Sequence, residues 1–115
     1  MPKTIVVEKP WGNFKQYTLN EISTVKILTV NPNEILSLQS HKNRDELWVP
    51  LDEGSKVQLN DKTLKPIAGE EIFIPKNTKH RLSSLGKKIR ILEISFGKFD
   101  ENDIERYEDK YDRVK

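Results

Sequence analysis

The sequence predicts an all-β domain, on the evidence of its apolar periodicity and its turn residues. Before residue 100, apolar and polar residues alternate with a period of two nearly everywhere, as they do in half-buried strands. Gly, Pro, Asn and Asp separate the apolar runs and mark turns. The pattern predicts about eight to ten short strands, which is typical of an antiparallel sandwich or barrel.

The predicted strands follow one another through short connections. They cover residues 24–30, 35–38, 47–51, 56–59, 63–67, 72–74, 81–85 and 89–96. An Asn-Pro-Asn turn follows the first strand at 31–33, and Asn-Asp-Lys at 60–62 predicts a β-hairpin. Pro50 lacks an N–H donor, so its strand should lie at a sheet edge or contain an irregularity. Only residues 101–115 look helical or irregular, and Asp103 is placed to cap a short turn there.

Length and composition limit the number of domains and the cellular setting. The chain has 115 residues, so we expect one domain over residues 1–115. There is no cysteine, which excludes disulfides, thiolate metal sites and cysteine nucleophiles. No apolar run approaches the roughly 20 residues that span a bilayer, and the N-terminus lacks the apolar core of a signal peptide. We therefore expect a cytoplasmic protein without a membrane partner.

The charge pattern argues against a nucleic-acid-binding protein. The 20 basic and 18 acidic residues give a net charge of +2 and are mixed along the chain. Nucleic-acid-binding surfaces usually show clustered basic residues with aromatic residues between them, and no such cluster is present in the sequence.

The two histidines of the chain belong to a candidate metal site. Gln39 and His41 are two residues apart, so on a strand both side chains point to the same face. Glu46 begins the next strand, and His80 lies in a loop that would return to the same end of a barrel. These groups leave coordination positions open for water or substrate, as catalytic metal sites do. Without a thiolate, Zn²⁺, Fe²⁺, Mn²⁺, Co²⁺ and Ni²⁺ all fit the ligand set.

Segments 39–46 and 75–80 resemble the two sequence motifs of the cupin family. Gln39 stands where most cupins have their first histidine. Asn33 and Asn77 stand where the motifs carry Gly, and Asn tolerates the left-handed backbone that Gly would favour. The resemblance implies a cupin fold, a double-stranded β-helix or jelly-roll-like barrel, here with a short C-terminal helical or irregular tail.

One subgroup of cupins is similar over most of the chain. The residues LSLQSHKNRDELW at 36–48 resemble the signature of type II phosphomannose isomerases. Pro-Trp-Gly at 10–12 and the Asp-Ile, Arg-Tyr-Glu-Asp pattern within 103–109 match as well. Leu47 departs from the histidine that is usual at its position. In this subgroup a guanylyltransferase domain usually precedes the cupin; no sequence precedes the chain's first residue, so we expect a cupin that stands alone.

This resemblance implies a metal-dependent mannose-6-phosphate isomerase. Such an enzyme interconverts mannose 6-phosphate and fructose 6-phosphate through an enediol, so a sugar phosphate is the expected substrate. The resemblance assigns Gln39, His41, Glu46 and His80 as the metal ligands. Zn²⁺ is the expected ion, with Mn²⁺, Co²⁺, Ni²⁺ and Fe²⁺ as alternatives. A homodimer is expected by analogy with other cupins.

Three basic residues are candidates for contacts with the substrate. Arg44 is the candidate catalytic residue, because its fixed charge suits a phosphate or an enediolate oxygen. Arg81 is a candidate substrate-binding residue; it directly follows a ligand, so on a strand it would point away from the metal, and an ion pair is the alternative. Lys79 is a second candidate for the phosphate, with an exposed role as its alternative. No residue is assigned as the general base.

Two other functions stay open at this point. A cupin that binds a metal or a sugar phosphate without catalysis is the first, because a fold does not fix a function. A metal-dependent oxygenase is the second, and Gln39 together with the two nearby arginines disfavours it.

Overall fold

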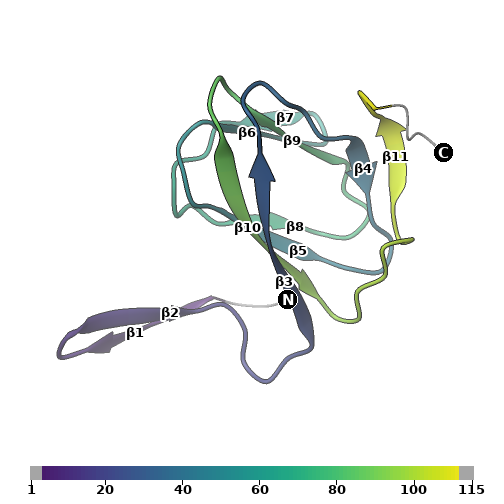
Figure 1. Cartoon of the computed structure of the whole chain (residues 1–115). Helices are drawn as coiled ribbons and strands as arrows, with labels where there is room; N and C mark the ends of the chain where they lie inside the picture. Colours follow the sequence, from purple (N-terminus) through teal and green to yellow (C-terminus); the bar gives the residue numbers. More distant parts are fainter. Residues whose placement is uncertain (1–3, 112–115) are drawn as a thin grey trace.

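The computed structural model describes residues 4–111; residues 1–3 and 112–115 of the expected domain lie outside this range. All regular structure within 4–111 is β-strand, so the all-β prediction is confirmed (Figure 1). In chain order the strands are β1 (Ile5–Lys9), β2 (Gly12–Gln16), β3 (Ser23–Val30), β4 (Leu38–Ser40), β5 (Glu46–Pro50), β6 (Ser55–Leu59), β7 (Lys62–Leu64), β8 (Ile72–Ile74), β9 (His80–Ser84), β10 (Ile89–Phe96) and β11 (Glu105–Glu108).

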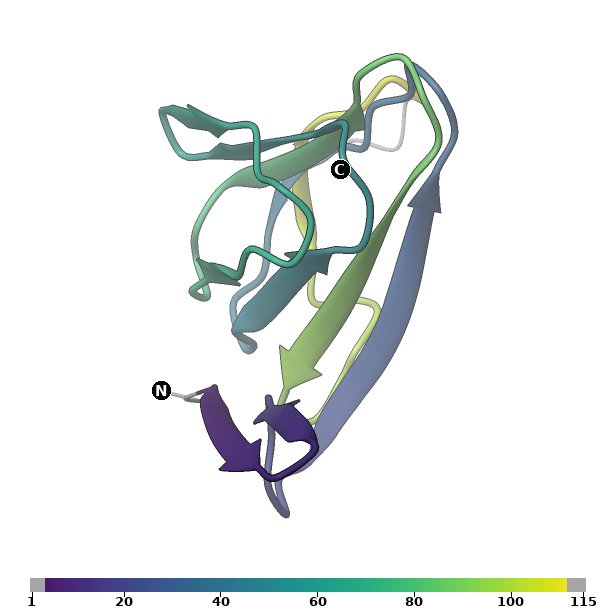
Figure 2. The same cartoon turned by 90° about the vertical axis from the view of Figure 1, so that its left-hand side faces the viewer.

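Two antiparallel sheets face each other and enclose the interior of the molecule. One sheet has the strand order β3-β10-β5-β8 and the other has the order β11-β4-β9-β6-β7. Figures 1 and 2 show the two sheets curving around a common interior, while the β1–β2 hairpin projects away from them. This is the jelly-roll-like barrel that the sequence predicts, and the β6–β7 hairpin lies where Asn-Asp-Lys at 60–62 placed it.

The inward-facing positions change from apolar to polar along the strands. On β10, Ile89 and Ile91 face the apolar core, whereas the later positions of the same parity are Glu93 and Ser95. On β9, buried Leu82 is two residues after buried His80. The interior therefore has an apolar part and a polar part. The apolar cluster consists of Val30, Trp48, Val57, Ile72, Ile74, Leu82, Ile89 and Ile91.

Strand β5 is buried along its whole length, which alternation alone does not predict. Leu47 and Val49 face away from the interior and pack in a second apolar cluster with Ile94 and Phe96. Pro50 does not lie on an edge strand, because β5 runs between β10 and β8. It is the last residue of β5, where a missing N–H is tolerated at the end of the ladder.

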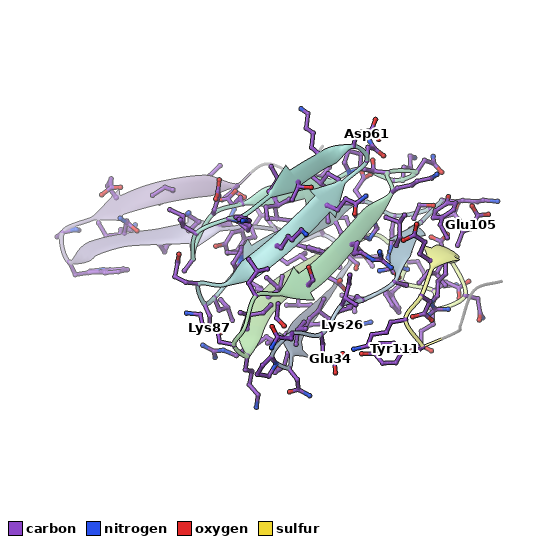
Figure 3. All side chains as sticks on the ribbon, turned by 90° about the horizontal axis from the view of Figure 1, so that it is seen from above. Lys26, Glu34, Asp61, Lys87, Glu105 and Tyr111 are labelled. Carbon is purple, nitrogen blue, oxygen red and sulfur yellow. The ribbon has the colours of Figure 1, made fainter. Side chains whose placement is uncertain are left out.

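The C-terminal segment differs from the helical or irregular tail that the sequence predicts. It forms strand β11, which pairs with β4 and has a bulge between Arg106 and Glu108. An edge strand exposes unpaired N–H and C=O groups, and β11 covers those of β4. Tyr111 then donates a hydrogen bond to Glu34 (2.6 Å) beside this edge, as Figure 3 shows from above. The segment therefore closes one side of the interior.

No helix within residues 4–111 is long and apolar enough to cross a membrane.

On the outer face of β3, Val25 and Ile27 are more than half exposed. The expected homodimer and the single domain over residues 1–115 stay predictions.

Candidate metal centre

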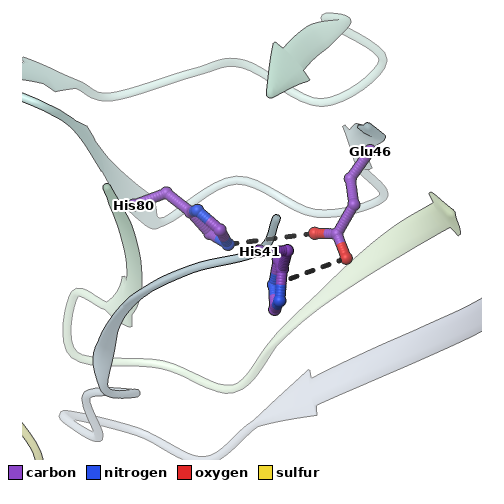
Figure 4. A group of neighbouring side chains, drawn as sticks. All are labelled: His41, Glu46 and His80. Carbon is purple, nitrogen blue, oxygen red and sulfur yellow. Dashed lines mark ion pairs between the residues drawn. The ribbon is translucent and has the colours of Figure 1, made fainter. Parts of the chain in front are cut away.

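Three of the four predicted ligands lie together in the polar part of the interior (Figure 4). His41 Nε2 lies 3.7 Å from Glu46 Oε2, and His80 Nε2 lies 3.9 Å from Glu46 Oε1. All three side chains are almost completely buried. His80 comes from the start of β9, Glu46 from the start of β5, and His41 from the residue after β4. Three separate strands thus bring the donors to one point.

Both imidazoles are oriented by hydrogen bonds to backbone carbonyls. His41 Nδ1 lies 2.7 Å from the Asp103 carbonyl oxygen, and His80 Nδ1 lies 2.9 Å from the Thr78 carbonyl oxygen. A carbonyl only accepts hydrogen bonds, so each Nδ1 carries the proton and each Nε2 keeps a lone pair. Outer hydrogen bonds of this kind fix the tautomer and the ring orientation of metal-binding histidines.

Burial favours the neutral, metal-binding form of both rings. Desolvation lowers the pKa of His41 and of His80, although the Glu46 carboxylate acts in the opposite direction on both. A histidine must be neutral to bind a metal. Both rings are therefore in the binding form at neutral pH.

The geometry fits one divalent ion. Two donor atoms that bind the same ion at about 2.1 Å lie no more than about 4.2 Å apart. The two histidine–glutamate distances are within that limit, and all three donor atoms lie within 4.8 Å of one another. His80 Nε2 is buried and makes no hydrogen bond within the described residues. A buried polar atom without a partner is costly, and coordination of an ion would satisfy it. The described residues thus include a buried His-Glu-His group that can bind a metal.

Gln39, the fourth predicted ligand, lies beside this group. It is the cross-strand partner of His80, and directly opposed residues in an antiparallel pair have their side chains on the same face. Its Oε1 accepts a hydrogen bond from Ser37 Oγ (3.0 Å). A carbonyl oxygen has two lone pairs, so one remains for an ion.

The Glu46 carboxylate is held by three donors. Arg44 Nε donates to Oε2 at 2.8 Å, Trp48 Nε1 donates to Oε1 at 3.3 Å, and Ser95 Oγ donates to Oε2 at 3.3 Å. These bonds fix the carboxylate toward the two histidines. Trp48 belongs to the apolar core as well, so one side chain connects the two parts of the interior.

Arg44 is buried at this centre. Its Nη2 lies 3.3 Å from His41 Nε2, and its Nη1 donates to the Asp100 carbonyl oxygen at 3.1 Å. Its guanidinium carbon lies 4.4 Å from the ring centroid of Phe99. The candidate catalytic arginine therefore lies among the candidate ligands.

The other two basic candidates lie elsewhere. Arg81 faces outward from β9, where it forms an ion pair with Glu108 (2.9 Å) and donates to the Leu36 carbonyl oxygen. Lys79 is exposed, with its ammonium group 4.4 Å from the ring centroid of Tyr107. The structure does not bring either residue to the histidines.

Two residues of the site were not singled out from the sequence. Glu93 and Arg106 line a cavity of about 510 Å³ together with Gln39, His41 and Arg44. Burial, and then the charge of Glu46, raises the pKa of Glu93 to about 7. Glu93 could have been found from the sequence, because it is a carboxylate inside an apolar strand pattern. Strand alternation places it on the same face as Ile89 and Ile91. Arg106 had no such signal, because its segment was expected to be helical or irregular.

Comparisons with known proteins identify a family and several relatives that are named for carbohydrate chemistry. The family described as "Mannose-6-phosphate isomerase C-terminal" matches residues 3–109. The chain is 37% identical over 110 residues to the alginate biosynthesis protein AlgA of Pseudomonas aeruginosa. It is 36% identical over 110 residues to the mannose-1-phosphate guanylyltransferase ManC of Salmonella typhimurium. Each match covers 94% of this chain and 23% of the relative, so the chain spans about a quarter of the length of these proteins.

Solved structures show the same fold at low sequence identity. The nucleoside dehydratase Pac13 from Streptomyces has a TM-score of 0.67 and 15% identity, covering 92% of this chain and 86% of that chain. CapF from Staphylococcus aureus, a capsular polysaccharide assembling protein, has a TM-score of 0.66 and 15% identity, covering 92% of this chain and 34% of that chain. These similarities confirm the predicted cupin architecture and carry no information on activity.

The comparisons overturn the assignment of this chain as a mannose-6-phosphate isomerase. The similar full-length proteins are named for mannose-1-phosphate guanylyltransferase or for the biosynthesis of alginate. The chain corresponds only to a C-terminal family domain. The prediction was wrong because it extended one activity of a resembling subgroup to a chain that spans about a quarter of its relatives' length. The broader prediction, a relationship to enzymes of carbohydrate metabolism, is confirmed.

Proposed function

The chain belongs to the family of mannose-6-phosphate isomerase C-terminal domains, and we propose that it is a metal-binding domain that binds a phosphorylated mannose. The observation that carries this proposal is the buried His41–Glu46–His80 group, in which His80 Nε2 makes no hydrogen bond to any described residue. The sugar enters the proposal from the relatives, among which ManC is named for mannose 1-phosphate.

The ion would be held by His41 Nε2, His80 Nε2 and the Glu46 carboxylate, with the Gln39 amide oxygen as a fourth donor. Zn²⁺ is the proposed ion, because two imidazoles and a carboxylate are ligands that it prefers. When bound, such an ion acts as a Lewis acid toward ligand oxygens. The chain's own residues contribute the buried setting, and the bonds to Asp103 and Thr78 orient the two rings.

A metal titration tests the proposal. Chelator-treated protein is titrated with Zn²⁺ in a calorimeter, and then with Mn²⁺, Co²⁺, Ni²⁺ and Fe²⁺. We expect one equivalent of Zn²⁺ to bind. His80→Gln should weaken its affinity by at least about 100-fold, because the loss of an outer-shell partner alone costs roughly 10–100-fold. Ser83→Ala is the matched control, since Ser83 is on the same strand but has the outward parity.

The ligand is tested on the same samples. We expect mannose 1-phosphate to bind more tightly to the Zn²⁺-loaded protein than to the chelator-treated protein. A folded chain that takes up no divalent ion, or a His80→Gln variant with unchanged Zn²⁺ affinity, would contradict the proposal.

A further inference from the structure

The cavity beside the metal centre has more cationic than anionic side chains facing it. Lys26, Arg44 and Arg106 line it, together with Glu93 and Glu101. Arg44 already has a carboxylate partner in Glu46. The other two cations come from opposite sheets, Lys26 from β3 and Arg106 from β11. They therefore approach the same space from two sides.

Arg106 is in register with the metal-binding residues. On one side Gln39 pairs with His80, and on the other side it pairs with Arg106. Residues that oppose each other across antiparallel strands have side chains on one face, so the three form a row directed into the interior. Neighbouring strands are about 4.8 Å apart, which places the Arg106 backbone about 10 Å from that of His80.

Arg106 has no partner for its charge within residues 4–111. Its Nε is buried and makes no hydrogen bond, and the ion pairs of the described residues do not include it. The side chain as a whole is only partly buried, but its Nε–H is buried and lacks an acceptor among the described residues, whereas buried polar groups are nearly always hydrogen-bonded. A buried guanidinium N–H in a cavity is therefore suited to an anionic ligand.

Lys26 is held over the same cavity. Its ammonium group lies 3.9 Å from the centroid of the Phe99 ring, and the Arg44 guanidinium carbon lies 4.4 Å from that centroid. A cation over an aromatic face is stabilised by the ring quadrupole. Glu93 is the cross-strand neighbour of Lys26, so Lys26 is partly compensated, which makes Arg106 the principal anion-binding group.

We propose that Arg106, supported by Lys26, binds the oxyanion of the ligand whose other end reaches the metal centre. The planar guanidinium suits the paired oxygens of a phosphate ester or of a carboxylate. This inference rests on the proposed function for the sugar, but the anion site itself does not depend on the metal. Arg106 differs in this respect from Arg81, whose guanidinium forms an ion pair with Glu108 on the outer face.

Calorimetric titration of the full chain tests the site. The ligands are mannose 1-phosphate, mannuronate and mannose on the Zn²⁺-loaded protein, and inorganic phosphate on both the loaded and the chelator-treated protein. The variants are Arg106→Gln, Arg106→Lys and Lys26→Gln. Arg90→Gln is the control, because Arg90 is an exposed arginine paired with Asp52. Circular dichroism and thermal unfolding establish that each variant is folded.

We expect Arg106→Gln to weaken the binding of mannose 1-phosphate at least tenfold, with Zn²⁺ and mannose affinities unchanged. Arg106→Lys should recover part of the loss, and Lys26→Gln should give a smaller loss. A preference for mannose 1-phosphate over mannuronate identifies a phosphate site, and the reverse preference identifies a carboxylate site. Equal oxyanion affinity in Arg106→Gln and the unmodified chain, or an equal loss for uncharged mannose, overturns the inference.

The two proposals fail in different ways. A chain that binds Zn²⁺ but has phosphate affinity independent of Arg106 overturns the anion site and leaves the metal-binding function. A chain that binds no metal overturns the proposed function. The anion site can then still be tested on the chelator-treated protein. Arg106→Gln should weaken the binding of inorganic phosphate to it.

Discussion

Within residues 4–111, two arginine–glutamate pairs have nearly the same separation in opposite surroundings. Arg44 Nε lies 2.8 Å from Glu46, and Arg81 Nη1 lies 2.9 Å from Glu108. In the first pair the side chains are 7% and 1% exposed, whereas in the second they are 16% and 65% exposed. Water screens the charges of the outer pair. Each charge of the inner pair is buried, so it needs its partner to offset the cost of desolvation. The distance between two charges therefore says little about their importance until their burial is known.

The two arginines reach these places for different local reasons. Arg81 follows His80 on strand β9, so strand alternation directs it to the outer face. Arg44 lies in the loop between β4 and β5, where alternation does not apply. It is drawn inward by Glu46, by the Asp100 carbonyl oxygen and by the ring of Phe99.

Removal of the inner carboxylate should reduce stability more than any other change considered below. Glu46→Gln should lower the free energy of unfolding of the metal-free protein by about 3–5 kcal/mol, because the Arg44 guanidinium stays buried without its counter-charge. Urea unfolding measures the change. The double variant Arg44→Met with Glu46→Gln should regain part of the loss, since it leaves no buried charge of the pair. A loss below about 1 kcal/mol in the single variant would contradict the importance of burial here.

A medium effect, with a defined pH dependence, is expected at Glu93. Its pKa is about 7 in the folded chain against an ordinary value of 4.5, so between these values the folded state binds more protons than the unfolded state. Its contribution to stability is complete below pH 4.5, falls as the pH rises toward 7, and is lost above that. Glu93→Gln removes this loss. The free energy of unfolding of the variant, minus that of the unmodified protein, should therefore be about 1–3 kcal/mol higher at pH 8 than at pH 4.5.

Urea unfolding of both proteins from pH 4.5 to 8 checks this prediction. The pKa values of His41 and His80 are lowered in the folded state, so the unfolded state binds protons more readily at these residues. Their contribution to stability therefore falls as the pH decreases, which is opposite to the effect of Glu93. The difference between the two proteins, rather than either curve, therefore isolates Glu93. A difference that does not change with pH would show that Glu93 titrates normally.

The smallest effect is expected at the outer pair. Glu108→Ala should change the free energy of unfolding by less than about 1 kcal/mol, because the carboxylate is mostly in water and the pair is screened by salt. Urea unfolding at low and high salt measures it. A loss of more than about 2 kcal/mol would mean that the outer pair carries stability comparable to a buried interaction, and the comparison would no longer hold.

The sequence predicted that the two histidines and Glu46 come together, but not which groups surround them. Gln39, His41 and Glu46 are close in the chain, and His80 was joined to them by the second motif. The bond from His41 to the Asp103 carbonyl was not predictable, because the partner is a backbone atom 62 positions away. Arg106 was missed for a related reason: the 101–115 segment has little strand pattern of its own and becomes a strand by pairing with β4.

The all-β class and the side chains with metal-binding donor atoms can both be recognised in the sequence. Alternation with a period of two fixes which residues of a strand share a face, and the donor chemistry of His, Glu and Gln belongs to the residues themselves. By contrast, it is the folded arrangement that brings Glu93, Arg106 and Arg44 to one cavity and leaves Arg81 and Lys79 outside it. Strand pairing and burial depend on partners distant in the chain, and the local pattern does not specify these partners.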